Sequence, residues 1–395
     1  MVQNIETSAC SMTLIVIYRT HDLLQNIASF AEATQRPAFL QKGRSLTPSS
    51  PVLIVPYMWI GDFVRCHTVV KLLQAQDPSR SIDMLTTGMV APLLDYMPGV
   101  RKGIIVDLPR KRLAFGEHGA LAKRLRAEGY GQALVMPRTW KSALAPYLAG
   151  IPVRTGFLGE GRFGLINDLR FGERRLPRMV DRCAALALSA EEPPAKEWPQ
   201  PELKVSAAEM AAWRQRLGLD TDSGPIALAP GAVGPSKRWP AEYFAELARR
   251  LLAQGHNIWV LGGSAEKDIA GKIAQGDPAR IRDLTGPDLR NAVLALAAAR
   301  AAVSNDSGLL HVAAALGTPS IGIFGPTSPW HWAPLNPIAA TIETTTELAC
   351  RPCHKPVCRL GHHRCMRDID VERVTLATLR SVIAASPAAE KLNAV

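Results

Sequence analysis

The sequence predicts an α/β protein made of two Rossmann-like, doubly wound domains that face each other across a cleft. From Val52 onward, short apolar runs alternate with amphipathic stretches, a pattern typical of βαβ units and a parallel sheet. The same alternation starts again at Ile226. Between the two series lies the proline-rich stretch EEPPAKEWPQPEL, residues 191–203, which we interpret as a linker.

Composition limits the classes of protein to consider. The chain has 395 residues, of which 47% are apolar, enough to build two globular cores. Its longest apolar run near the start, Met12 to Tyr18, is too short to span a membrane and lacks the basic lead of a signal peptide, so we expect a cytoplasmic protein.

The net charge of +11 suits an acidic partner. Because no nucleic-acid-binding motif accompanies that charge, we expect no nucleic acid partner.

The domain boundaries follow from these patterns. Residues 1–48 carry no sustained period and end in SLTPSSP, so we interpret them as an N-terminal extension that need not be ordered. The first domain is expected over residues 49–203 and the second over 204–378, followed by a tail at 379–395.

The first domain contains the elements of a parallel sheet. Buried strands are predicted at Val52–Val55, Ile82–Leu85, Gly103–Val106 and Ala133–Met136. Helices are predicted at Phe63–Ala75, Ala91–Tyr96, Gly119–Ala127 and Lys141–Leu148.

The second domain repeats the pattern. Strands are predicted at Ile226–Leu228 and Ile258–Leu261, and a helix at Leu289–Ala299. Between the two strands, a helix is expected to have Pro240 at its first position and Gly255 just past its end. Phe244, Leu247, Ala248, Leu251 and Leu252 form its apolar stripe at helical spacing.

Residues 303–326 form the unit around which the site is predicted. A strand at Ala301–Val303 leads into the turn Ser304–Gly308, then a helix at Leu309–Leu316 and a strand at Ser320–Phe324. Ligands of parallel sheets bind at the carboxyl ends of the strands, and a helix start offers free N–H groups to an anion. The alternative is that Asp306 and Ser307 only cap the helix.

Three motifs occur in an order that resembles a known family. Trp59-Ile60-Gly61-Asp62, PGAVGPSKRWP (residues 230–240) and NDSGLLHVAAALGTP (residues 305–319) are similar to motifs of the ADP-heptose:lipopolysaccharide heptosyltransferases. These are inverting glycosyltransferases of the GT-B fold. The segment Ser142–Arg170 resembles the type II enzyme in particular, and the likeness extends from Val52 to Val374.

The resemblance implies roles for the reacting groups. Asp62 would be the general base that takes the proton of the acceptor hydroxyl, although a helix cap is its alternative role. Lys237 would neutralise the charge that builds on the departing ADP. Asp306 would hold the heptose hydroxyls.

The resemblance also implies binding residues for two substrates. For ADP-heptose these are Gly231, Lys237, Glu266, Asp306, Ser307, Gly308 and His311; as a residue of a first helical turn, Glu266 also has a structural alternative. For the acidic acceptor they are Arg138, Lys141, Arg154 and Arg162. No bound metal or other cofactor is implied.

The implied acceptor is a core oligosaccharide anchored by lipid A. We therefore expect the protein to act at the cytoplasmic face of the inner membrane, in peripheral contact with anionic lipid. Two alternatives stay open, a type I heptosyltransferase acting on Kdo2-lipid A and a non-catalytic nucleotide-sugar-binding protein. An oxidoreductase is disfavoured because no G-x-G-x-x-G follows the first strand.

Four of the seven cysteines cluster near the end of the chain. Cys350, Cys353, Cys358 and Cys365 form C-x2-C-x4-C-x6-C with histidines between them. Clustered cysteines in a cytoplasmic protein favour a metal over disulfides, and zinc is the leading candidate. Because the spacing departs from the usual paired C-x2-C pattern, a reduced loop without metal is an equal alternative.

Overall fold

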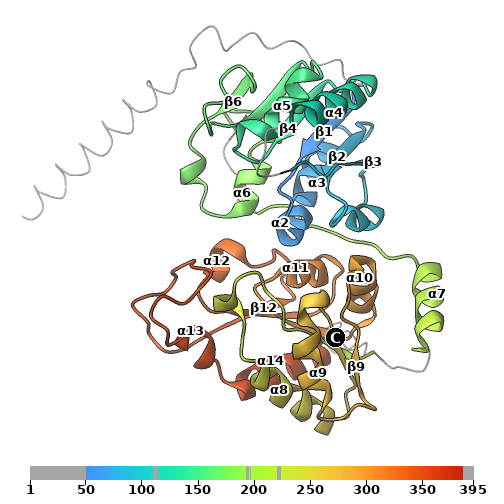
Figure 1. Ribbon diagram of the computed structural model, residues 1–395, viewed down its shortest axis with the longest axis vertical. Helices are drawn as coiled ribbons and strands as arrows, with labels where there is room; N and C mark the ends of the chain where they lie inside the picture. The colour runs from blue at the N-terminus through green and yellow to red at the C-terminus, as the bar shows by residue number, and fades with distance from the viewer. Residues whose placement is uncertain (1–49, 110–113, 193–194, 196, 220–223, 386–395) are drawn as a thin grey trace, which may run out of the picture. The chain divides into compact units, whose positions relative to one another are not determined.

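A computed structural model describes residues 50–109, 114–192, 195, 197–219 and 224–385 (Figure 1). The extension predicted at residues 1–48 lies outside the described residues. The boundary predicted at residue 378 falls inside a helix, α14, which spans Val371–Ala384.

The N-terminal lobe is built on a sheet of six parallel strands. They are β1 (Val52–Val55), β2 (Ile82–Thr86), β3 (Lys102–Ile105), β4 (Gln132–Val135), β5 (Val153–Phe157) and β6 (Asp168–Arg170). Their order in the sheet is β3-β2-β1-β4-β5-β6. The order reverses between β1 and β4, which is where doubly wound sheets bind ligands.

The C-terminal lobe repeats this arrangement. Its strands are β7 (Ile226–Ala229), β8 (Ile258–Val260), β9 (Ile281–Asp283), β10 (Ala301–Asn305), β11 (Ser320–Phe324) and β12 (Ala339–Glu343). The order β12-β11-β10-β7-β8-β9 places the reversal between β7 and β10. In register, Ala301 of β10 lies opposite Ile226 of β7. The structure therefore confirms the predicted α/β fold with two doubly wound sheets.

The strands carry apolar side chains on both faces, so both faces of a sheet need to be covered by helices. In β1, Val52 and Ile54 belong to one buried apolar cluster and Leu53 and Val55 to another, so alternate side chains point to opposite faces. Both faces are packed, as expected for a parallel sheet. The first cluster continues into the C-terminal lobe, where it includes Ala227 of β7.

Helices connect the strands of each lobe. In the N-terminal lobe they are α2 (Ile60–Arg65), α3 (His67–Gln76), η2 (Ala91–Tyr96), α4 (Phe115–Ala127), α5 (Trp140–Leu148), η3 (Glu173–Arg175) and α6 (Met179–Ala184), with α7 (Ala207–Leu217) following the linker. In the C-terminal lobe they are η4 (Pro235–Lys237), α8 (Ala241–Ala253), η5 (Ser264–Glu266), α9 (Lys267–Ala274), α10 (Leu289–Ala298), α11 (Gly308–Ala315), α12 (Pro329–Trp332), α13 (Arg364–Arg367) and α14. Throughout the described parts of the chain, no helix is both long and apolar enough to cross a bilayer.

One predicted element differs in a way that matters for the site. The helix predicted at Phe63–Ala75 is two helices, α2 and α3, which meet at Cys66. Because α2 begins at Ile60, Trp59 is its N-cap residue and Asp62 lies in its first turn. The carboxylate of Asp62 is therefore not the N-cap of this helix, and its role as general base stays a prediction.

Candidate active site

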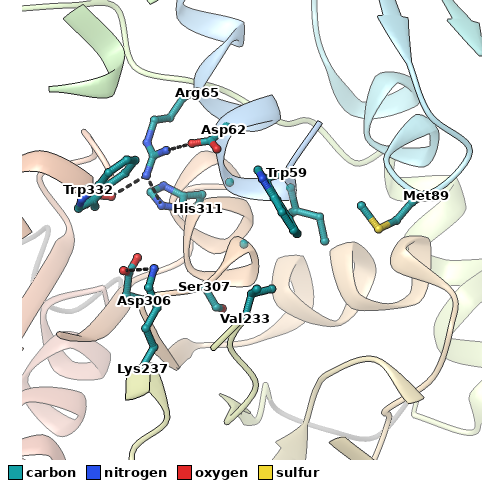
Figure 2. A pocket seen from close by; sticks show the side chains of 13 residues that line it. Trp59, Asp62, Arg65, Met89, Val233, Lys237, Asp306, Ser307, His311 and Trp332 are labelled. Carbon is teal, nitrogen blue, oxygen red and sulfur yellow. Dashed lines mark hydrogen bonds and ion pairs between the residues drawn. The ribbon is translucent and has the colours of Figure 1, made fainter. Parts of the chain in front are cut away.

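A cavity of about 340 Å³ lies at the carboxyl ends of the strands where both sheets reverse their order. The N-terminal lobe contributes residues of α2 and its flanks and Met89 after β2 (Figure 2). The C-terminal lobe contributes the loop after β7, the start of α11 and Trp332 of α12. The lining residues are Trp59, Ile60, Gly61, Asp62, Arg65, Met89, Val233, Lys237, Asp306, Ser307, Gly308, His311 and Trp332. Both catalytic residues predicted from the sequence, Asp62 and Lys237, are in this set.

Close contact between α2 and α11 forms one wall of the cavity. A Cβ atom on Gly61 would lie 2.7 Å from Cδ2 of His311, and a Cβ atom on Gly308 would lie 2.6 Å from Cβ of Ile60. Both distances are shorter than any real carbon contact, so only glycine allows the two backbones to approach this closely. This approach brings Asp62 and His311 from different lobes to the same cavity (Figure 2).

Arg65 joins the two sides of this contact and was not predicted from the sequence. It is almost fully buried, and its guanidinium forms an ion pair with Asp62 one turn earlier in α2. Its Nη2 atom also donates to the Trp332 carbonyl at 2.8 Å and lies 2.8 Å from Nε2 of His311. Because arginine only donates hydrogen bonds, Nε2 of His311 is the acceptor and Nδ1 carries the proton.

The electrostatics of this group favour a basic carboxylate beside a neutral imidazole. Burial raises the pKa of Asp62 above the usual aspartate value, while Arg65 and Lys237 oppose the rise. Burial, together with the cations Arg65 and Lys237, lowers the pKa of His311 well below its usual value. A carboxylate with a raised pKa is a better proton acceptor than a solvated one, provided that it stays ionised at working pH.

A second charged group lies on the opposite side of the cavity (Figure 2). Lys237 Nζ donates to Asp306 Oδ2 at 2.7 Å, and the Thr327 hydroxyl donates to the same oxygen at 2.8 Å. Asn305 fixes the geometry, because its side chain accepts from Trp239 N–H at 3.0 Å and donates to the Pro230 carbonyl at 2.7 Å. The end of β10 is thereby tied to the loop that carries Lys237.

The start of α11 supplies backbone donors to the cavity. Ser307 is the N-cap residue of the helix, but its side chain makes no capping bond and lies 3.0 Å from the Ser304 hydroxyl. The alternative that Asp306 and Ser307 only cap the helix is therefore wrong. The first N–H groups of α11 remain available to an anion at the cavity, with the helix dipole in support.

Two of the predicted donor-binding residues lie outside the lining of this cavity. Gly231 and Glu266 are adjacent, since a Cβ atom on Gly231 would lie 2.8 Å from the Glu266 carboxyl carbon. The carboxylate of Glu266 accepts the Gly263 N–H at 2.9 Å, which is the structural role given above as its alternative. A role in binding the ribose of ADP stays a prediction.

Two of the four predicted acceptor-binding residues need correction. Arg162 is 0% exposed, and its guanidinium donates to the carbonyls of Phe157 and Pro137. Arg154 is also buried, and it donates to the carbonyls of Ile151, Gly164 and Leu165. These guanidiniums satisfy buried backbone oxygens, so they hold β5 and its neighbouring loop together and do not face a ligand.

The other two predicted acceptor residues remain on the surface. Arg138 is half-exposed and pairs with Glu173 at 3.0 Å. Lys141 lies in the first turn of α5. The arrangement therefore reduces the predicted acceptor cluster to Arg138 and Lys141, and their role stays a prediction.

The four clustered cysteines line one common cavity. Cys350, Cys353, Cys358 and Cys365 are free thiols. Among the residues that the structure describes, no three histidine, cysteine, aspartate or glutamate side chains are placed to hold one metal ion. The zinc site and the metal-free loop, the two alternatives given above, both stay predictions.

The effect of Arg65 on the pKa of Asp62 can be tested through the pH dependence of activity. If Asp62 is the base, its protonation at low pH stops the reaction, so the acidic limb of kcat reports its pKa. Arg65 lowers that pKa, so Arg65→Gln is expected to move the acidic limb to higher pH. The measurement is a pH–rate profile, with Arg80→Gln as control because Arg80 pairs with Asp77 at the same spacing but does not line the cavity. An unmoved limb would separate Arg65 from the ionisation of Asp62.

Comparisons with known proteins agree with this geometry. The model of glycosyltransferase family 9, described as heptosyltransferase, matches residues 118–363. The chain is 36% identical over 337 residues to lipopolysaccharide heptosyltransferase 2 of Escherichia coli strain K12, covering 82% of this chain and 96% of that protein. It is 30% identical over 325 residues to lipopolysaccharide heptosyltransferase 1 of Pseudomonas aeruginosa strain PAO1, covering 78% of this chain and 87% of that protein. The solved structure of E. coli ADP-heptose lps heptosyltransferase II matches with a TM-score of 0.74 and 34% identity, covering 84% of this chain and 98% of that one.

Proposed function

This chain belongs to glycosyltransferase family 9, the heptosyltransferases, and from that premise we propose that it adds the second heptose of the lipopolysaccharide inner core. The donor would be ADP-heptose, supplying L-glycero-D-manno-heptose, and the acceptor would be heptosyl-Kdo2-lipid A. The higher identity to a heptosyltransferase 2 than to a heptosyltransferase 1 supports the second addition over the first.

One observation carries the mechanism. The carboxylate of Asp62 from one lobe and the Lys237–Asp306 pair from the other line the same cavity (Figure 2). Inverting transfer needs a proton acceptor on the side of the attacking hydroxyl and a cation on the side of the leaving diphosphate. A protein that only bound a nucleotide sugar would not need both groups.

In the proposed reaction, Asp62 takes the proton of the acceptor hydroxyl as its oxygen attacks the anomeric carbon. The bond from that carbon to the diphosphate breaks, and the electron pair leaves with ADP. Lys237 and the N–H groups at the start of α11 stabilise the negative charge on the departing diphosphate. Asp306 orients the heptose hydroxyls, and Thr327 holds Asp306 in place through its hydrogen bond.

We assign the two substrates to different lobes. Residues 49–203 would bind the acceptor, and residues 204–378 would bind ADP-heptose, because Lys237, Asp306 and α11 all follow strands of the second sheet. The net charge of +11 supports peripheral contact with anionic lipid at the inner-membrane cytoplasmic face, where the lipid-anchored acceptor would be met.

The activity is tested by incubating the protein with ADP-heptose and one of two acceptors, heptosyl-Kdo2-lipid A or Kdo2-lipid A. The products are identified by mass spectrometry. We expect one heptose to be added to heptosyl-Kdo2-lipid A and none to Kdo2-lipid A, with the Asp62→Asn protein as the inactive control. Addition to Kdo2-lipid A alone would make this a type I enzyme. Binding of ADP-heptose with no transfer to either acceptor would support a non-catalytic protein.

The acceptor site is tested by neutralising its two surface cations. Each basic residue near an anionic surface contributes about 1 kcal/mol, so the double variant Arg138→Gln/Lys141→Gln is expected to raise the acceptor KM about tenfold or more and to leave the donor KM unchanged. Glutamine is preferred to glutamate because Arg138 pairs with a buried Glu173, which a new carboxylate would repel.

The matched control is Arg249→Gln/Lys272→Gln, which removes the same charge from exposed positions on α8 and α9. Added salt should weaken acceptor binding far more than donor binding, since exposed charges are screened within a Debye length. An effect of the Arg138/Lys141 variant on the donor KM alone would place the acceptor elsewhere.

A further inference from the structure

The N-terminal side of the active-site cavity is mostly apolar. The lining residues from this lobe are Trp59, Ile60, Gly61, Asp62, Arg65 and Met89. Only Asp62 and Arg65 among them are charged, and the guanidinium of Arg65 is already engaged with Asp62, with His311 and with a backbone carbonyl. This side of the cavity therefore offers a ligand one carboxylate and otherwise apolar surface.

Trp59 is the largest side chain of this apolar surface. It is 51% exposed, and Met89 on the same lobe is 53% exposed. Both side chains extend from the N-terminal lobe into the cavity (Figure 2). An exposed indole inside a cavity is apolar surface that a bound ligand can cover, and removing it from water favours binding.

The backbone on both sides of Trp59 is held in place. Its carbonyl accepts the N–H of the fully buried Phe63 at 2.8 Å. The next residue, Ile60, packs so closely on α11 that a Cβ atom on Gly308 would lie 2.6 Å from its own Cβ. Because a tryptophan also has only two side-chain torsions, little conformational entropy is lost when a ligand packs on it. Trp59 is thus a preorganised contact surface.

The position of Trp59 along α2 relates it to the reacting hydroxyl. Trp59 is the N-cap residue and Asp62 follows three residues later, a spacing at which the two side chains are neighbours. Three residues correspond to about 4.5 Å along a helix axis. A hydroxyl that gives its proton to Asp62 must lie within hydrogen-bond distance of that carboxylate. The group that carries this hydroxyl is therefore within reach of the indole.

We propose that Trp59 is the stacking platform of the acceptor site, on which the C–H face of the sugar ring that presents its hydroxyl to Asp62 packs. The inference rests on the proposed function, because it takes Asp62 as the base and a sugar as the acceptor. A pyranose ring carries its hydroxyls at the edge and C–H groups on its faces, and the face of an indole is electron-rich. Stacking fixes the ring while the hydroxyl at its edge stays free to meet Asp62.

The platform is tested by binding, without turnover. The full chain, in the absence of donor, is titrated by calorimetry with heptosyl-Kdo2-lipid A from which the fatty acids have been removed. Trp59→Phe keeps a flat ring and should keep most of the affinity, whereas Trp59→Leu is apolar but not flat and should lose about tenfold or more. ADP affinity should be unchanged in both variants. Trp330→Leu is the matched control, because Trp330 of α12 is also exposed but does not line the cavity.

The contact itself is read from tryptophan fluorescence. The chain has eight tryptophans, so the signal of Trp59 is taken as the difference between the unchanged protein and Trp59→Phe. The acceptor excludes water from the indole and should shift this difference emission to shorter wavelength, whereas ADP should leave it in place.

The outcomes separate this inference from the proposed function. Equal acceptor affinity in Trp59→Leu and the unchanged protein, or a loss of ADP affinity in that variant, would overturn the stacking role while leaving the proposed transfer intact. Failure of the unchanged protein to bind the acceptor would overturn the proposed function and the platform together.

Discussion

Replacing Asp62 by asparagine is expected to lower kcat by about 10²–10⁴-fold while ADP-heptose affinity stays nearly unchanged. The amide has the shape of the carboxylate and can still accept a hydrogen bond from Arg65, so α2 should keep its contact with α11. It cannot accept a proton at neutral pH, and the attacking hydroxyl then loses its base. The loss is therefore expected in turnover and not in binding.

The measurement combines steady-state kinetics with calorimetric titration of the donor. Asp77→Asn is the control, because Asp77 also pairs with an arginine three residues away but lies in the turn after α3, away from the cavity. Near-normal turnover in Asp62→Asn would remove Asp62 from the mechanism. A lost donor affinity together with a changed melting temperature would show that the variant damages the contact between the lobes.

Lys237→Ala and Asp306→Ala are expected to fail in different ways, although the two side chains form one ion pair. Without Lys237, both ADP affinity and kcat should fall, kcat by about 10²-fold or more, because charge grows on the diphosphate as the sugar leaves. Without Asp306 the heptose loses its anchor, but Nζ of Lys237 is released and still available to the diphosphate. ADP affinity should then be kept while ADP-heptose turnover falls.

The distinction is made by titrating ADP and ADP-heptose separately into each variant. Lys272→Ala on α9 is the matched control for loss of a lysine, since that side chain is exposed and distant from the lining of the cavity. An equal loss of ADP affinity in the Lys237 and Asp306 variants would contradict the separate roles.

Much of the fold was predictable because the buried strands of parallel sheets are continuous apolar runs. The strand at Ser320–Phe324 was predicted with its observed bounds, and β1 likewise. Strands β5, β6, β9 and β12 were not predicted, because polar residues or glycine interrupt each of them. Of these, β6, β9 and β12 are edge strands. Their pairing depends on the neighbouring strand and leaves no periodic signal in the sequence.

The site was predictable where its residues follow strands, and less so where it depends on packing. Asp62, Lys237, Asp306 and His311 lie at strand or helix ends that the motifs mark, and the structure brings all four to one cavity. Arg65 was missed because its partner His311 is 246 positions away, and only the contact between α2 and α11 joins them. Arg154 and Arg162 were misassigned for the opposite reason, since the charge of an arginine does not reveal that carbonyl groups surround it.

The order of the strands has a consequence for how the protein forms during synthesis. The described strands of the first sheet all lie between residues 52 and 170, and those of the second between 226 and 343, with no strand exchanged. The first sheet can therefore assemble while the ribosome is still making the second, as domains generally fold in turn from the N-terminus. Asp62 would be in place early, but the wall that carries Lys237 and Asp306 exists only once β10 and α11 have emerged. A nascent chain thus has no complete donor cavity until most of its length has been translated.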